Sequence, residues 1–254
     1  MSKILVIPDI HSTPEVPNTR ADYLANLIID TRPDIVVNLG DSADLNSLSS
    51  YDKGKRSFVG RTYRADINHH LEFQSRMWDP VRARKKKLPR RVVLFGNHEN
   101  RIERVLDLSP ELAGTVGLSD LDYDQYYDDV VHYDGGTPGI IKLDGILFSH
   151  YFSTGVSGRP VSGDNAASML ITKLRTSCVA GHLHTWDYSV RHNLDGQVCS
   201  GLVAGCFHDH IPGWAGNTAR LWRPGVTFLN NAEDGNYDVE FISLKALEKE
   251  YGNV

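Results

Sequence analysis

The sequence has few cysteines and no long hydrophobic run. Its three cysteines, Cys178, Cys199 and Cys206, are odd in number and match in spacing neither a disulfide framework nor a CxxC metal site. No window approaches the roughly 20 apolar residues that a membrane helix needs. The N-terminal apolar run stops at Pro8-Asp9, too early for a signal peptide. We therefore expect a cytoplasmic protein that has no membrane partner and buries its cysteines as small apolar side chains.

The sequence also lacks a linker. No Pro/Gly/Ser-rich spacer, low-complexity tract or internal repeat interrupts it. The hydrophobic fraction of 41% and the charged fraction of 23% are ordinary for a globular protein, and a chain of 254 residues can build one substantial core. We expect residues 1–254 to form a single domain, and the sequence does not predict its oligomeric state.

Charge is distributed unevenly along the chain. The formal net charge is −5, yet residues 53–91 hold 13 Lys and Arg residues against 3 acidic ones. The rest of the chain holds 14 basic and 29 acidic residues. We interpret residues 45–91, approximately, as an inserted basic lobe that meets an anionic ligand. The alternative is an ordinary solvated surface.

Apolar runs rich in β-branched residues predict buried strands early in the chain. The first three are expected at 3–8, 34–39 and 91–95, with a helix at 20–31 between the first two. Later, Asp-Gly dipeptides separate neighbouring apolar runs and so predict hairpins. The later elements are hairpins at 139–149 and 186–204, a helix from an N-cap at Asp164 to about 174, strands at 177–180, 225–229 and 237–243, and a short C-terminal helix. This order predicts an α/β sandwich with neighbouring parallel strands.

Five blocks of Asp, Asn and His follow the ends of predicted strands. They are Asp9-Ile10-His11, Gly40-Asp41-Ser42-Ala43-Asp44, Gly96-Asn97-His98-Glu99, His150 and Gly181-His182-Leu183-His184. Loops at the carboxyl ends of strands are where open α/β sheets build their sites. A mixed set of carboxylate, carboxamide and imidazole groups suits borderline divalent metals. The blocks therefore predict a metal site.

All five blocks, in this order, resemble the calcineurin-like metallophosphoesterase superfamily, and the compact chain resembles its short bacterial and phage-encoded members. The resemblance implies a two-sheet, four-layer α/β sandwich that hydrolyses a phosphate ester with two divalent transition-metal ions. We expect manganese, with Fe, Co, Ni and Zn as alternatives. Hydroxide or water held by the ions would be the nucleophile. The implied ligands are Asp9, His11, Asp41 and His184 for the first ion, and Asp41, Asn97, His150 and His182 for the second, with Asp41 bridging.

The same resemblance assigns catalytic roles to His98 and Asp44. His98 would donate to a phosphoryl oxygen or protonate the leaving group, and Asp44 would accept a hydrogen bond from His98. We also expect Arg101 to reach a phosphate, with a salt bridge as the alternative. The protein-phosphatase branch of the family has Arg-Gly where this chain has Leu45-Asn46, which argues against phosphoprotein substrates.

A phosphodiesterase or nuclease acting on a nucleic acid or a nucleotide is the function we expect. Arg61 and Arg64 of the basic lobe are candidate phosphate contacts, together with Arg56 and Lys85-Lys86-Lys87. The first alternative is a phosphomonoesterase acting on a small metabolite. The second is an interaction scaffold that binds metal without catalysis. His208-Asp209-His210 resembles a ligand triplet, but we interpret it as a loop, or as a contact at the rim, because the two-metal set is already complete.

Overall fold

The computed structural model describes residues 1–84, 86–156, 158–194, 196–212 and 215–252. Its larger sheet has the strand order β13-β12-β1-β2-β3-β4. The four strands β1 to β4 are parallel, so their carboxyl ends meet at one edge, and β12 and β13 are antiparallel additions beside β1. The bounds are β1 (Ser2–Ile7), β2 (Ile35–Asn38), β3 (Arg90–Leu94), β4 (Asp129–Val131), β12 (Gly225–Glu233) and β13 (Asn236–Ser243).

The second sheet has the strand order β10-β11-β9-β6-β5. Its three central strands β11, β9 and β6 are parallel, while β10 and β5 are antiparallel edges. The bounds are β5 (Ile141–Leu143), β6 (Ile146–Ser149), β9 (Cys178–Ala180), β10 (Trp186–His192) and β11 (Val198–Ala204). A separate short ribbon joins β7 (Ser153–Thr154) to β8 (Arg159–Pro160).

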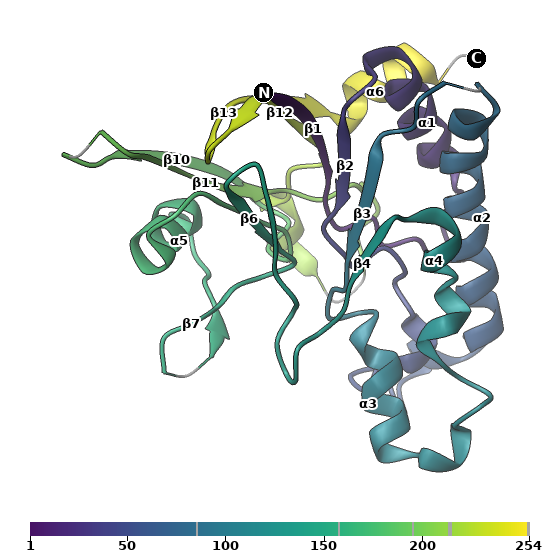
Figure 1. The fold of residues 1–254 in the computed structure, drawn as a ribbon. Coiled ribbons are helices and arrows are strands. Elements are labelled where there is room, and N and C mark those ends of the chain that lie inside the picture. Colours follow the sequence, from purple (N-terminus) through teal and green to yellow (C-terminus); the bar gives the residue numbers. More distant parts are fainter. Residues whose placement is uncertain (85, 157, 195, 213–214, 253–254) are drawn as a thin grey trace.

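Helices cover the outer faces of both sheets. Figure 1 shows α1 (Thr19–Thr31) and α2 (Tyr63–Ala83) against the larger sheet, and α5 (Ala166–Leu174) against the other. The remaining helices are α3 (Asn100–Leu108), α4 (Tyr123–Tyr126), α6 (Leu244–Tyr251) and the 3₁₀ turns η1 (Asn46–Leu48), η2 (Arg56–Phe58), η3 (Pro110–Leu112), η4 (Leu118–Leu121) and η5 (Gly216–Leu221). The predicted four-layer α/β sandwich is therefore confirmed.

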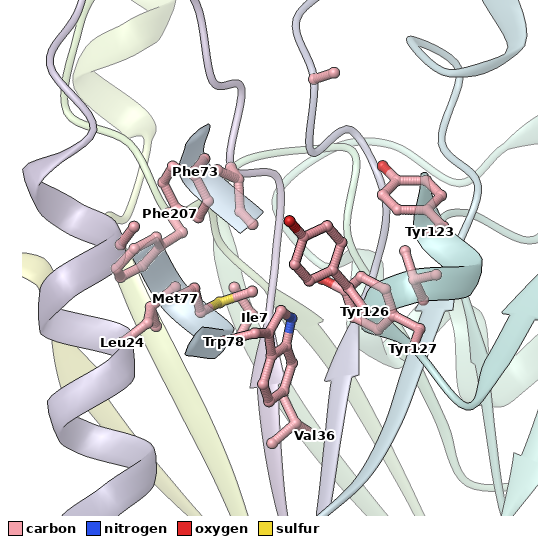
Figure 2. Close-up of a cluster of buried hydrophobic side chains, with 14 of the residues drawn as sticks. Ile7, Leu24, Val36, Phe73, Met77, Trp78, Tyr123, Tyr126, Tyr127 and Phe207 are labelled. Carbon is pink, nitrogen blue, oxygen red and sulfur yellow. The ribbon is translucent and has the colours of Figure 1, made fainter. Parts of the chain in front are cut away.

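Apolar clusters hold the four layers together. Between the sheets, side chains such as Val37 and Leu94 pack with Phe148 and Leu202 of the opposite sheet. Outside the larger sheet, Phe73, Met77 and Trp78 of α2 pack with Leu24 and Val36, and with the tyrosines of α4 (Figure 2). A third cluster joins α5 to the second sheet through Ala167, Leu170 and Val203. Each of the two sheets therefore packs against an apolar cluster on both of its faces.

Sequence reasoning did not expect a helix within the basic segment 45–91, but α2 occupies 21 residues of it. Its apolar residues Phe73, Met77 and Val81 recur every four positions and form one buried helical face. The Thr62 hydroxyl caps the helix by accepting from the Ala65 amide. The many charged residues of α2 made this helical periodicity of apolar residues difficult to recognise in the sequence. Helix α2 is therefore a structural layer of the fold, and its arginines lie outside its buried face.

Two smaller expectations have clear outcomes. The three cysteines are free and buried, as predicted. The helix with the expected N-cap at Asp164 is shifted by one residue, because Asn165 occupies the cap position; the Asn165 side chain makes no capping hydrogen bond. Among the described residues no helix is long and apolar enough to cross a membrane.

We expect Trp78→Ala to lower the free energy of unfolding by about 3–5 kcal/mol, because the indole is completely buried between α2 and the sheet. Chemical denaturation measures this change. Val59→Ala is the control, since Val59 is 83% exposed and its removal should change the free energy by less than about 0.5 kcal/mol. Equal stabilities of the two variants would contradict the packing of α2.

Candidate metal centre

All seven predicted metal ligands lie at the carboxyl edge of the two sheets. Parallel strands bring their carboxyl ends to the same edge, so loops that are distant in sequence become neighbours. In the larger sheet, the loop after β1 carries Asp9 and His11, the loop after β2 carries Asp41, and the loop after β3 carries Asn97. In the second sheet, the loop after β6 carries His150, and the loop after β9 carries His182 and His184.

Five of these residues have a left-handed backbone, which is unusual for residues other than glycine. The φ angles are 38° at Asp9, 47° at His11, 49° at Asp41, 70° at His182 and 59° at His184. Each such residue costs of the order of 1–3 kcal/mol, and strain of this kind concentrates at functional sites. The left-handed conformation lets the chain turn sharply after each strand, so that the side chains of these five residues point toward the same cluster.

The carboxylate of Asp41 lies at the centre of the cluster. Its Oδ2 is 3.3 Å from His150 Nε2 and 3.7 Å from His11 Nε2. Its Oδ1 accepts the backbone N–H of His98 at 2.8 Å. Two groups of metal-binding atoms, each within 4.8 Å of one another, share this residue: His11, Asp41 and His98 form one, and Asp41, His150 and His182 the other.

Asp9 and Asn97 complete the cluster on either side of Asp41. Oδ1 of Asp9 is 3.4 Å from His184 Nε2, and both Asp9 oxygens accept the His182 N–H at 3.0 Å. Asn97 Oδ1 is 3.1 Å from His150 Nε2. The structure therefore brings the seven predicted ligands together.

Charge and protonation in the cluster fit bound cations. Burial lowers the pKa of His11 and of His182 to about 4, so both imidazoles are neutral at pH 7 and have a lone pair to offer. Burial alone would raise the pKa of Asp41, but the facing imidazoles of His150 and His98 outweigh it and hold the pKa well below its usual range. Nε2 of His11 and Nδ1 of His184 are buried without a hydrogen-bond partner among the described residues. Such nitrogens are the atoms that a divalent transition metal would satisfy.

Two glycines of the motifs, Gly96 and Gly181, pack so closely against candidate ligands that no side chain fits there. A Cβ on Gly96 would overlap the carboxylate of Asp41, and a Cβ on Gly181 would overlap the carboxylate of Asp9. Any side chain at either position would displace a candidate ligand.

His98 and Asp44 lie beside the cluster as a contacting pair. His98 Nδ1 is 2.9 Å from Asp44 Oδ1 and 2.8 Å from the Asp44 carbonyl. Burial lowers the pKa of His98, but the carboxylates of Asp41 and Asp44 outweigh it, so the pKa is raised above its ordinary value. Asp44 Oδ1 also lies 3.1 Å from His11 Nδ1, so it orients two imidazoles at once.

The predicted basic contacts occupy different places. Arg101 lies at the site, where Nη1 donates to the Asp44 carbonyl at 2.8 Å and Nη2 is 3.0 Å from His98 Nε2. Arg61 is 2.7 Å from Asp52, and Arg64 is exposed at the start of α2. Lys86 and Lys87 precede β3 and lie at the sheet edge opposite the site, so they do not serve as site contacts. Lys85 lies outside the described residues.

Glu99 is a structural centre of the loops that carry the cluster. Its buried carboxylate accepts from the backbone N–H groups of Asp41 at 2.9 Å, Ser42 at 2.7 Å and Gly96 at 2.9 Å, and from the Tyr123 hydroxyl at 3.0 Å. Burial and the nearby Asp41 raise the pKa of Glu99. The residue joins the loop after β2 to the loop after β3.

Sequence reasoning missed the roles of Arg20 and His208. Arg20, buried on α1, donates to the backbone carbonyls of Ile10 and Phe207 and so joins the loop after β1 to the loop after β11. His208 is only 1% exposed, and its ring centroid is 5.0 Å from those of His11 and His184. His208 therefore lies in a loop, as predicted, but it belongs to the buried cluster and is not a contact at the rim. Its position just after a predicted strand was the available signal.

Comparison with known proteins identifies the family of the chain. A family model of calcineurin-like phosphoesterases matches residues 2–218, so the chain belongs to the calcineurin-like phosphoesterase family. The chain is 25% identical over 248 residues to the Gene 54 protein of Mycobacterium phage L5, a match that covers 93% of this chain and 83% of that protein.

Two solved structures are similar over almost their whole length. One is Yfce, a phosphoesterase from E. coli, with 14% identity and a TM-score of 0.40, covering 95% of this chain and 99% of that one. The other is TT1561 of Thermus thermophilus, with 11% identity and a TM-score of 0.38, covering 96% of this chain and 99% of that one. Family membership makes the chain a metal-dependent phosphoester hydrolase, and its Asp and His clusters are suited to divalent ions.

We expect Glu99→Ala to lower the free energy of unfolding by at least about 2–3 kcal/mol, because several buried N–H donors lose their acceptor. The melting temperature and the metal content are the measurements, and both should fall. Glu103→Ala, an exposed change on α3, should leave both unchanged. A Glu99→Ala protein as stable as the wild type would contradict the bracing role.

Proposed function

We propose that the chain is a two-metal phosphodiesterase that acts on a nucleic acid or a nucleotide. The observation that carries this proposal is Asp41, which is shared by two groups of metal-binding atoms, one of which includes His98. Asp9, His11, Asp41 and His184 would hold one ion, and Asp41, Asn97, His150 and His182 the other. Manganese is the proposed ion, with Fe, Co, Ni and Zn as alternatives. The free, buried cysteines agree with a cytoplasmic location.

Two such ions, when bound, supply the Lewis acidity that activates water and polarises a phosphoryl oxygen. The protein's own groups bind and orient the ester. A cavity of about 590 Å³ opens beside the cluster and includes Asn97, His98, Arg101 and His182 in its lining. A phosphate in this cavity would be held against the cluster with its leaving group directed outward.

His98 is the proposed general acid. Asp44 fixes its Nδ1 at 2.9 Å, which leaves Nε2 as the nitrogen available to substrate. Because the pKa of His98 is raised, the protonated ring persists to higher pH than in a free histidine. Nη2 of Arg101 lies 3.0 Å from the same nitrogen. Because a guanidinium can only donate, an incoming phosphoryl oxygen would displace this contact and then accept from both groups. His98 would then donate its proton to the leaving oxygen.

The outer wall of the cavity supports a nucleotide substrate. Tyr51, which is 78% exposed, lines it together with Lys55 and Trp222. Aromatic faces beside a basic side chain suit a base and its phosphate. Arg61 and Arg64 remain candidate contacts for a longer nucleic acid, although a phosphate would have to replace Asp52 as the partner of Arg61. The complete ligand set argues against a scaffold without catalysis.

We expect the manganese-loaded protein to hydrolyse bis-p-nitrophenyl phosphate with a higher kcat/KM than p-nitrophenyl phosphate. A panel of single-stranded DNA, RNA, cyclic nucleotides and dinucleotides then identifies the substrate class. A preference for the monoester, with no activity on the panel, would favour a phosphomonoesterase of small metabolites and contradict the proposal.

His98→Ala should lower kcat by roughly 10²–10⁴-fold, because the proton donor is lost. Its metal content should stay at the wild-type value. A fall in metal content together with kcat would assign His98 to metal binding instead. Elemental analysis of the purified variant separates the two outcomes.

Asp41→Asn should reduce the bound metal from two ions per chain to one or fewer, because a carboxamide cannot bridge two cations as a carboxylate does. Elemental analysis after saturation and desalting measures this loss. Asp52→Asn is the matched control, since Asp52 lines the same cavity but pairs with Arg61. Two ions retained in Asp41→Asn would contradict the bridging role.

A further inference from the structure

His208 is a buried imidazole that the proposed two-metal set does not use. It follows β11, which runs parallel to β9, so its loop lies at the same sheet edge as the loop of His182 and His184. One ring nitrogen from each of His11, His184 and His208 lies within 4.8 Å of the other two. This group contains both imidazoles assigned to the first ion.

The hydrogen bonds of His208 direct a lone pair into that group. Its Nδ1 is 3.2 Å from the His210 carbonyl, which can only accept, so the proton lies on Nδ1. Nε2 of the neutral ring then carries the lone pair. This nitrogen is buried and has no hydrogen-bond partner within the part of the chain that the structure describes.

Two of the predicted ligands show the same arrangement. His150 Nδ1 is 3.0 Å from the Leu39 carbonyl, and His11 Nδ1 is 3.1 Å from Asp44, while Nε2 of each faces the cluster. Histidines that ligate metals commonly donate their second N–H to a carbonyl or carboxylate in this way. His208 therefore has the orientation of a ligand, and with 1% exposure it is too buried to be a substrate contact at the rim.

We propose that His208 is an additional ligand of the ion that His11 and His184 hold, a step that rests on the two-metal centre proposed above. The first ion would then have three imidazoles beside Asp9 and Asp41. Arg20 stabilises this arrangement, because it joins the carbonyls of Ile10 and Phe207, each one residue before a histidine of the group.

A third imidazole changes which metal the first position prefers. Imidazole suits Co, Ni and Zn, whereas Mn is better served by carboxylate and water oxygens. His208 should therefore raise the affinity for Co²⁺ more than the affinity for Mn²⁺. Its removal should move the selectivity of this position toward Mn²⁺.

The test compares His208→Asn with His208→Gln. Asn can keep the hydrogen bond to the His210 carbonyl but has no atom at the Nε2 position, while the longer Gln can return an oxygen to that position. We expect His208→Asn to lower the Co²⁺ affinity of one of two sites by at least roughly tenfold. Removing a group that only hydrogen-bonds to a metal ligand already costs about 10–100-fold in affinity, so the loss of a ligand itself should cost no less. Mn²⁺ affinity should fall less, and His208→Gln should lie between His208→Asn and the wild type.

Calorimetric titration with each metal and the d–d absorption band of the Co²⁺-loaded protein are the readouts. His210→Ala is the matched control, because it removes the neighbouring ring and keeps the carbonyl that His208 uses. Its Co²⁺ spectrum and affinities should match those of the wild type. Circular dichroism establishes that each variant is folded.

The outcomes separate this inference from the proposed function. If the wild type binds two ions and folded His208→Asn has the same Co²⁺ affinity and spectrum, His208 is not a ligand and the inference fails alone. If His208→Asn loses Co²⁺ affinity as expected but the wild type hydrolyses no phosphodiester, the inference stands and the proposed substrate class fails.

Discussion

The arrangement of the site depends on the buried carboxylate of Asp41, whose negative charge is stabilised by neighbouring imidazoles and a backbone N–H. Removing a carboxylate from water costs several kcal/mol unless other groups stabilise its charge. Here the imidazoles of His150 and His98 and the backbone N–H of His98 perform that task. Because the two histidines come from loops of different sheets, the full stabilisation exists only when the sheets are correctly stacked.

The surrounding fold fixes the loops from outside the site. Glu99 joins the loops after β2 and β3, and Arg20 joins the loops after β1 and β11. Both groups are buried, and both act on backbone atoms. Their hydrogen bonds offset the unfavourable φ angles at residues such as Asp9 and Asp41. Each strained loop is thus held through its backbone by a buried side chain from another part of the chain.

Sequence predicted the parts of the fold that have a simple period. The strands ending before Asp9 and Asp41 were expected because buried strands are continuous apolar runs, and the strand before His150 was expected as one arm of a hairpin. Helix α2 was not expected, because its buried positions are spread among many charged residues. The ligand blocks were recognisable as short motifs. His208 lies outside those motifs; its position after a predicted strand was a signal, but the parallel pairing of β11 with β9 is what places it beside His184.

The tight contact of Gly96 and Gly181 with the two aspartates has a consequence for how such a site diversifies. Neither position has room for a Cβ, so a substitution at either glycine displaces a ligand before it alters recognition. The outer wall has exposed residues such as Tyr51 and Lys55, which no ligand position constrains. New substrates must therefore be acquired at the mouth of the cavity. In chains of this kind the residues around the ligands should change little, while the residues at the mouth of the cavity change freely.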